Sequence, residues 1–293
     1  MSSPFAGIRV IDTLMDVPEP DSKGYANLKG LLRGDGAKKE EGEPVSYMFK
    51  GDAKSGMDDD SVAFVLAAMD AHNVGQSLIE LGKVGSASDT ACQKHPDRFL
   101  PIVTLDPNRG MGAVRYLEKS VRERGVVAAS ITPAFLNPQV PIDDKRCYPI
   151  YAKCVELDIP VFITVGVPGP RVPMAPQNVE LLDEVCWFFP ELKIVMRHGA
   201  EPWEELAVKL MLKWPNLYYS TSAFAPRWYP KAIIDFANTR GADKIIYAGY
   251  FPVGLTLDRI FEEMPHVPFK EHVWPKFLRE NAIRVLGLDG DES

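Results

Sequence analysis

The sequence predicts a single α/β domain, a (β/α)₈ TIM barrel in which eight parallel strands alternate with helices. Three observations support this fold class. Eight short runs rich in β-branched and aromatic residues alternate with longer segments that have apolar residues at helical spacing. The 293 residues fall in the size range of one such barrel. No strand is followed by the G-x-G-x-x-G turn of a dinucleotide-binding sheet, which disfavours the alternative of an open doubly wound sheet.

The predicted strands are short and are bounded by glycine, proline or polar residues. A strand must return to the same end of the sheet before the next one begins, so the alternation favours parallel pairing with right-handed crossovers. The runs that we assign to strands are residues 7–12, 76–81, 99–104, 126–132, 160–165, 192–198, 217–221 and 244–248.

The segments between the strands carry apolar residues three or four positions apart, which is the spacing of an amphipathic helix. Asp58 and Ser61 supply side-chain acceptors ahead of the first of these segments, and Pro149 falls in the first turn of another. The predicted helices are residues 61–72, 111–124, 148–157, 178–189, 203–214, 228–239 and 277–286.

One long connection, residues 16–60, interrupts this alternation after the first strand. Its glycines, prolines and charged residues leave little apolar surface to bury. Loops that follow barrel strands lie on the catalytic face. We therefore expect either a lid over the site, anchored by Tyr47, Met48 and Phe49, or a solvated loop without a task.

The composition is that of a globular protein with an acidic balance. The 33 basic and 40 acidic residues give a formal charge of -7, which disfavours binding to nucleic acid or to an anionic membrane. No apolar run approaches the roughly 18 residues that cross a bilayer, and the first residues do not resemble a signal peptide. The four cysteines are irregularly spaced, so we expect reduced thiols. These features predict one domain over residues 1–293, a cytoplasmic location and a small-molecule ligand.

Five local sequences carry a resemblance to a known family. They are residues 11–16 (IDTLMD), 160–168 (PVFITVGVP), 193–203 (KIVMRHGAEPW), 246–252 (IYAGYFP) and 277–288 (FLRENAIRVLGL). In this order they resemble the strand-one D-x-H-x-H, the strand-five PVFIHVG, the strand-six histidine, the strand-eight FGSDYP and the closing helix of the metal-dependent amidohydrolase-related family, in its aminocarboxymuconate-semialdehyde decarboxylase-like branch. The resemblance implies decarboxylases, hydratases or hydrolases of small substrates, and it also implies a homodimer.

Most of the metal ligands that the resemblance implies are replaced in this chain. The two strand-one histidines are Leu14 and Asp16, the strand-five histidine is Thr164, and the strand-eight aspartate is Tyr250. Only His198 is retained. Leucine has no ligand atom, and neutral threonine and tyrosine are weak donors to zinc, so we expect no tightly bound metal. A weak divalent cation held by two carboxylates and waters stays an alternative.

Three side chains are the candidate catalytic residues. His198 is a general acid or base because histidine titrates near physiological pH. Tyr250 is mostly protonated near neutrality and serves as an acid or hydrogen-bond donor. Asp16 is a base or an acceptor for His198. The alternatives are a structural, hydrogen-bonded histidine and an aspartate that only caps the long loop.

The candidate substrate-binding residues are hydroxyls and charged groups at or after the strand ends. Arg227 would meet an anionic substrate group, with a surface salt bridge as the alternative. Arg197 is expected to face the helices and to form a structural pair if its strand stays regular, with a bend that brings it to the mouth as the alternative. The binding candidates are Thr132, Thr164, Thr221, Ser222, Arg227 and Glu80.

Three functions are consistent with this pattern. The first is a hydrolase or lyase that works without a tightly bound metal, by acid–base catalysis at the C-terminal mouth of the barrel, on a small polar or carboxylated organic substrate. The second is a non-catalytic relative that binds a small ligand or a partner protein. The third is a metal-dependent hydrolase with an atypical ligand set from Glu80, Asp106 or the long connection.

Overall fold

The computed structural model describes residues 4–19, 28, 30–33, 57 and 60–289. Most of the connection of residues 16–60, including Tyr47, Met48 and Phe49, lies outside these residues. The expected lid and its anchor therefore stay predictions.

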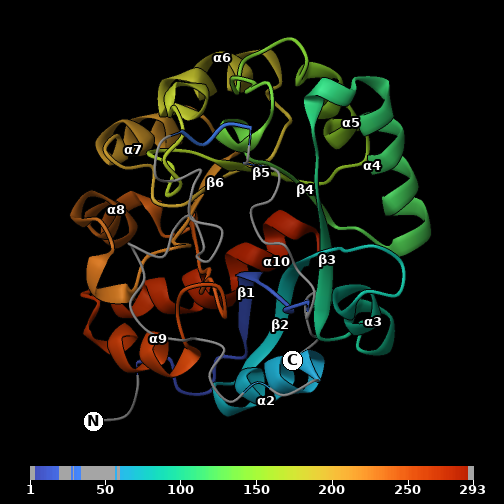
Figure 1. Ribbon diagram of the computed structural model, residues 1–293. Coiled ribbons are helices and arrows are strands. Elements are labelled where there is room, and N and C mark those ends of the chain that lie inside the picture. The colour runs from blue at the N-terminus through green and yellow to red at the C-terminus, as the bar shows by residue number, and fades with distance from the viewer. Residues whose placement is uncertain (1–3, 20–27, 29, 34–56, 58–59, 290–293) are drawn as a thin grey trace.

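Eight strands form one parallel sheet in the order of the sequence, which confirms the predicted barrel (Figure 1). Each pair of consecutive strands contributes a ladder. The strands are β1 (Val10–Met15), β2 (Val74–Glu80), β3 (Phe99–Thr104), β4 (Ala128–Ile131), β5 (Val161–Thr164), β6 (Ile194–Arg197), β7 (Leu217–Ser220) and β8 (Ile245–Ile246). The first strand runs three residues further than the sequence predicts.

Contacts between β1 and the chain after β8 bring the two edges of the sheet together. The backbone N–H of Thr13 donates to the carbonyl of Tyr247 at 3.1 Å, and Met15 forms a parallel bridge with Phe251. The sheet is therefore a nearly closed barrel, whose interior is filled by side chains.

Helices surround the strands in Figure 1. They are α2 (Ser61–Ala71), α3 (Ala87–Lys94), α4 (Met111–Arg124), α5 (Tyr148–Glu156), α6 (Leu182–Phe188), α7 (Glu204–Lys213), α8 (Lys231–Phe236), α9 (Leu257–Glu263) and α10 (Asn281–Leu286). Local signals set their ends: the Asp60 carboxylate accepts the Ala63 N–H ahead of α2, and Gly125 ends α4 at φ 64°. Within the described ranges, no helix has the length and apolarity to span a bilayer.

The apolar core has two layers. The larger layer lies between the strands and the surrounding helices. The smaller layer fills the barrel interior and includes Ile11, Leu78, Phe162 and Val195. Residues of α10 join the interior layer, so this helix covers one end of the barrel. Because side chains alternate along a strand, the interior layer fixes which residues face the other end.

Candidate active site

Polar side chains lie two residues beyond the interior apolar layer, at the carboxyl ends of the strands. Side chains alternate along a strand, so the residue two positions after an interior residue also faces inward. The interior residues that precede these polar residues are Ile11, Leu78, Ile102, Ala128, Phe162, Val195 and Tyr218. The polar residues are Thr13, Glu80, Thr104, Ser130, Thr164, Arg197 and Ser220. This end, which we call the mouth, is where barrel enzymes hold their catalytic groups.

A bulge in β1 turns Asp16 toward the mouth. The register with β2 shifts between Asp12 and Met15, so that Met15 joins the outer core layer. Asp16 follows, and its backbone N–H donates to the carbonyl of Phe251 at 2.9 Å. The Asp16 carboxylate acts on the ionisation of Glu80, which places the two side chains in the same cluster.

Arg197 lies at the mouth, which we expected only if the end of its strand were bent. It ends β6 in register with Thr164, and its guanidinium points into the barrel, 4.7 Å above the Phe162 ring. The side chain donates to the Ser130 hydroxyl at 3.3 Å and to the Thr13 carbonyl at 3.4 Å. Burial lowers its pKa to about 10, so Arg197 still carries its charge at neutral pH.

Glu80 is a carboxylate whose ionisation is tuned by its surroundings. It accepts the backbone N–H and the hydroxyl of Thr104 at 2.7 and 2.8 Å. Loss of water around the carboxylate, and the nearby Asp16, raise the pKa of Glu80 to about 7 against the opposing effects of Thr104 and Arg197. The side chain as a whole keeps solvent contact, so water reaches this part of the mouth. A carboxyl group with this pKa can give or take a proton near neutrality.

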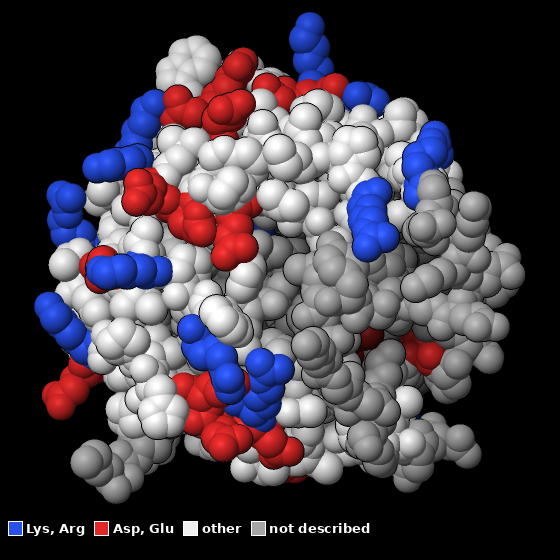
Figure 2. Space-filling model, turned by 60° about the vertical axis from the view of Figure 1, so that its left-hand side comes forward, with Lys and Arg blue, Asp and Glu red and all other residues white. Residues whose placement is uncertain are grey.

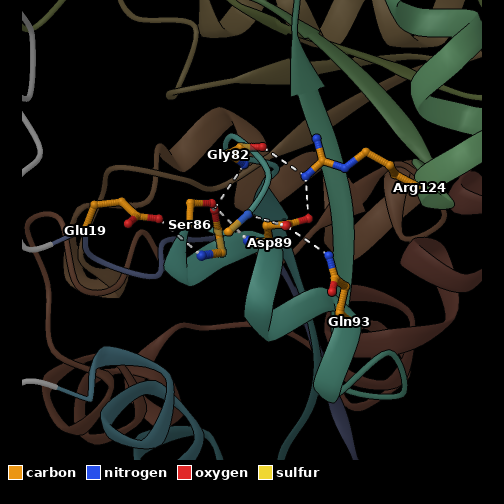
Figure 3. Close-up of polar contacts among 8 residues, drawn as sticks. Glu19, Gly82, Ser86, Asp89, Gln93 and Arg124 are labelled. Carbon is orange, nitrogen blue, oxygen red and sulfur yellow. Dashed lines mark hydrogen bonds and ion pairs between the residues drawn. The ribbon is translucent and has the colours of Figure 1, made fainter.

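The turn after Glu80 is held by a buried ion pair (Figure 3). Arg124 of α4 donates to the Asp89 carboxylate at 2.6 Å and to the Gly82 carbonyl at 3.0 Å. Asp89 also accepts from the Gly85 N–H and from the Gln93 amide, at 2.7 and 2.9 Å. These contacts fix the start of α3 against α4 and thereby the end of β2.

The same turn contacts the chain beyond β1. The Glu19 carboxylate accepts the backbone N–H of Ser88, in the first turn of α3, at 3.3 Å (Figure 3). The Ser88 hydroxyl in turn accepts the Gly82 N–H at 3.0 Å. The beginning of the long connection is therefore attached to the β2–α3 turn.

His198 lies directly after β6 and contacts Ser222, two residues beyond β7, and Tyr250. Its Nδ1 is 3.2 Å from the Ser222 hydroxyl, and its ring meets the Tyr250 ring edge to face with centroids 5.4 Å apart. Burial and the neighbouring Arg197 charge lower the pKa of His198 to about 3. The imidazole is thus neutral at physiological pH, and the titration near pH 7 expected from its residue type is absent.

Backbone conformations that ordinary residues seldom adopt are concentrated at these strand ends. His198 and Ala200 have φ 66° and 58° after β6, Ala223 has φ 70° after β7, and Tyr250 has φ 63° after β8. A positive φ costs a non-glycine residue free energy, and such positions often accompany functional sites. The turns that present His198 and Tyr250 are therefore specified by the surrounding structure.

The predicted hydroxyl residues divide between two faces of the barrel wall. Thr164 and Thr132 lie 3.5 Å apart at the mouth, and Ser222 contacts His198. Thr221 was placed at the mouth incorrectly, because alternation after Ser220 turns it outward. Its hydroxyl accepts the Ala248 N–H at 3.3 Å and contacts Tyr229 in the layer beneath the helices.

Arg227 forms the salt bridge that the sequence analysis held as the alternative. Its guanidinium is bonded to Glu263 of α9, and Arg259 donates to the same carboxylate at 2.9 Å. An anionic substrate is therefore not needed to explain Arg227. Figure 2 shows basic and acidic side chains in contact with one another on the face that it presents.

Another carboxyl group with a raised pKa, Asp12, lies outside the mouth and is buried. Asp12 points to the helix side of β1 and accepts the N–H groups of Leu14 and Gly249 through Oδ1, each at 2.9 Å. Burial raises the pKa of Asp12 to about 7. The hydroxyl of Tyr247 interacts with the Asp12 carboxylate and opposes this rise. Because the two N–H groups belong to β1 and to the chain after β8, Asp12 links the edges that close the barrel.

The family model described as amidohydrolase matches residues 11–288, and the chain therefore belongs to the amidohydrolase family. No curated protein sequence matches it.

Solved structures resemble the whole barrel. An uncharacterized TIM-barrel protein from Bordetella bronchiseptica is 21% identical with a TM-score of 0.70, covering 95% of this chain and 98% of that one. The 5-carboxyvanillate decarboxylase of Novosphingobium aromaticivorans, complexed with manganese and a nitrobenzoic acid, is 17% identical with a TM-score of 0.66 and coverages of 96% and 97%. The 2,6-dihydroxybenzoate decarboxylase from Rhizobium is 18% identical with a TM-score of 0.64 and coverages of 96% and 98%. At these identities the likeness shows the fold.

The residues at the mouth do not fit the divalent metal that the family implies. Among the residues that the structure places, no three His, Cys, Asp or Glu side chains come together as a metal site. Thr164 and Tyr250 contribute neutral oxygens, and the Arg197 charge acts on both His198 and Glu80. The Arg197 guanidinium would repel a metal cation among these side chains.

Proposed function

We propose that this protein is a lyase or hydrolase of the amidohydrolase family that acts, without a tightly bound metal, on a small carboxylated organic substrate by acid–base catalysis at the barrel mouth. The carrying observation is the cluster of Asp16, Glu80, Arg197, His198 and Tyr250 at the carboxyl ends of the strands. A carboxyl group with a raised pKa beside other polar and charged groups is a common source of an acid or a base at a site.

Glu80 is the proton-transfer group in this proposal. In a decarboxylation, the bond between the ring carbon and the carboxylate breaks, CO₂ leaves, and the electron pair of that bond stays on carbon. The protonated Glu80 delivers the proton that completes the product, and water restores it. A pKa of about 7 leaves both forms of Glu80 populated at neutral pH.

The other groups orient the substrate. Neutral His198 and the phenol of Tyr250 offer hydrogen bonds, and the fixed turns that carry them limit how far they can move. Asp16 stays the candidate for a base or for an acceptor that positions a substrate hydroxyl.

The test is turnover of small hydroxylated aromatic carboxylates by the purified protein. The similarity in fold to the two decarboxylases suggests 5-carboxyvanillate and 2,6-dihydroxybenzoate as the first compounds to test. The release of CO₂ is the quantity measured. We expect Glu80→Gln to lower kcat about 100-fold or more, and Tyr250→Phe to lower it by a similar factor. Asp258→Asn, at an exposed position on α9, is the matched control and should retain the wild-type rate.

A ligand-binding protein without turnover is the second candidate. The hydroxyls of Thr132, Thr164 and Ser222 favour it, since such groups orient a polar ligand without strong chemistry. Stabilisation of the protein by these compounds, with no product from any of them, would replace the enzymatic proposal with this one.

A further inference from the structure

Arg197 is a buried cation whose hydrogen bonds all go to neutral groups. Its side chain is 5% exposed, Nε has no acceptor, and the two bonds to Ser130 and Thr13 are long, at 3.3 and 3.4 Å. Those acceptors belong to β4 and β1, while Arg197 comes from β6, so the guanidinium reaches across the centre of the barrel. Among the residues that are placed, no carboxylate forms an ion pair with it.

Such a cation is costly in the protein interior without an anionic partner. The Glu80 charge acts on Arg197, but the hydrogen bonds that the Glu80 oxygens accept come from Thr104, at 2.7 and 2.8 Å. A guanidinium has five N–H donors, of which Arg197 uses two. The unused donors can take both oxygens of one carboxylate.

We propose that Arg197 is the anion-recognition group of the site and binds one carboxylate of the substrate at the floor of the mouth. The proposal rests on the proposed function for the place of the substrate, but the binding itself requires no turnover. The Phe162 ring lies under the guanidinium, so the anion reaches it from the mouth side. The rest of the ligand then extends toward Glu80, Asp16 and Tyr250.

This placement determines which substrate group reacts. A guanidinium stabilises a carboxylate more than the neutral CO₂ that would form from it, so it opposes the loss of the carboxylate that it holds. The group bound by Arg197 therefore persists in the product, and the bond that breaks lies near Glu80. The substrate class is an aromatic or similar acid with a second reacting group, such as a dicarboxylate.

The first experiment measures binding with benzoate as the probe and benzamide as its neutral counterpart, by calorimetry. We expect benzoate to bind wild-type protein and benzamide to bind at least tenfold more weakly. Arg197→Met should weaken benzoate binding about tenfold or more. Arg197→Lys keeps the charge but cannot form the bidentate pair of hydrogen bonds, so it should have an intermediate effect. Arg284→Met is the control, because Arg284 lies over the Tyr218 ring and away from the mouth.

A second measurement does not depend on the folding of a variant. In ¹⁵N-labelled wild-type protein, saturating benzoate should shift the Arg197 Nε–H resonance, because that donor now acquires an acceptor. Benzoate binding without a shift of this resonance, or with equal affinity in Arg197→Met, overturns the assignment. If benzoate does not bind to the wild-type protein, the assignment is also wrong, even if the protein turns over other compounds.

A separate measurement tests whether the carboxylate bound by Arg197 remains in the product. With two carboxylates, 5-carboxyvanillate should be decarboxylated, whereas 2,6-dihydroxybenzoate, with one, should bind and inhibit. Equal turnover of both overturns the inference about the reacting group. Benzoate binding with no turnover of either compound contradicts the proposed function and leaves Arg197 as an anion-binding residue.

Discussion

At the scale of single residues, the site depends on environment more than on residue type. Histidine ordinarily titrates near neutrality and glutamate near pH 4, yet His198 is neutral and Glu80 titrates near 7. One buried guanidinium lowers the pKa of both groups, because it opposes a positive charge on His198 and favours a negative one on Glu80. For His198 this adds to the effect of burial, whereas for Glu80 the loss of water outweighs it. A sequence lists these groups without their distances, so it could not assign the proton-transfer role to Glu80.

Asp12 gives a residue-scale prediction about stability. Its folded-state pKa of about 7 exceeds the unfolded value near 4, so the folded protein binds the proton more tightly. The stability that this proton contributes is complete below about pH 4 and is lost as the pH rises through about 7. Asp12→Asn removes the titration and keeps the Oδ1 acceptor, so its Tm relative to that of the wild type should rise by about 2 °C or more between pH 5 and pH 8.

The measurement is thermal unfolding of both proteins from pH 5 to pH 8. Glu80→Gln controls for the other carboxyl group with a raised pKa. Parallel Tm curves for wild type and Asp12→Asn would show that Asp12 is ionised in the folded protein throughout this range.

At the scale of elements, periodicity identified the strands but not the details that aim the side chains. The bulge in β1 changes which residues face inward, and nothing in the string VIDTLM marks it. In β6, Ile194, Val195 and Met196 are all apolar, so alternation could not reveal that Arg197 faces inward. Its pairing with Thr164, which faces inward, becomes known only from the register of β5 and β6 in the structure. Neither α3 nor α9 was among the predicted helices, and in α3 the string ASDTACQK lacks apolar spacing.

The β2–α3 turn supports an element-scale prediction. Asp89 is 3% exposed, and Arg124 is its charged partner. Arg124→Leu leaves the carboxylate buried without a counter-charge and should cost about 3 kcal/mol of unfolding free energy. Asp89→Asn in addition should recover part of that loss, as a double-mutant cycle in urea would measure. Equal losses in the single and double variants would mean that the ion pair does not hold the turn.

At the scale of the whole molecule, the barrel keeps its architecture while the groups at one end change. The family resemblance places metal ligands at positions whose side chains belong to neither apolar layer. At the β1–β8 contacts these positions contribute only backbone hydrogen bonds. Packing and chemistry therefore occupy different layers, which is why the fold could be predicted from periodicity repeated eight times. The predicted homodimer stays a prediction, although Trp187 and Phe188 of α6 are exposed.

The last prediction concerns metal binding by the whole protein. A site with a Kd of about 10 μM would stabilise the fold by about 2.7 kcal/mol at 1 mM Mn²⁺, which corresponds to a rise in Tm of roughly 5 °C or more. Because Arg197 opposes a second cation and the neutral oxygens of Thr164 and Tyr250 are poor ligands, we expect neither Mn²⁺ nor Zn²⁺ to shift Tm by more than about 1 °C. Elemental analysis should find less than about 0.1 equivalent of either metal, and dialysis against a chelator should leave turnover unchanged. A rise with Mn²⁺ that Glu80→Gln abolishes would instead establish a cation held by Glu80 and Asp16, and the proposed metal-independent chemistry would be wrong.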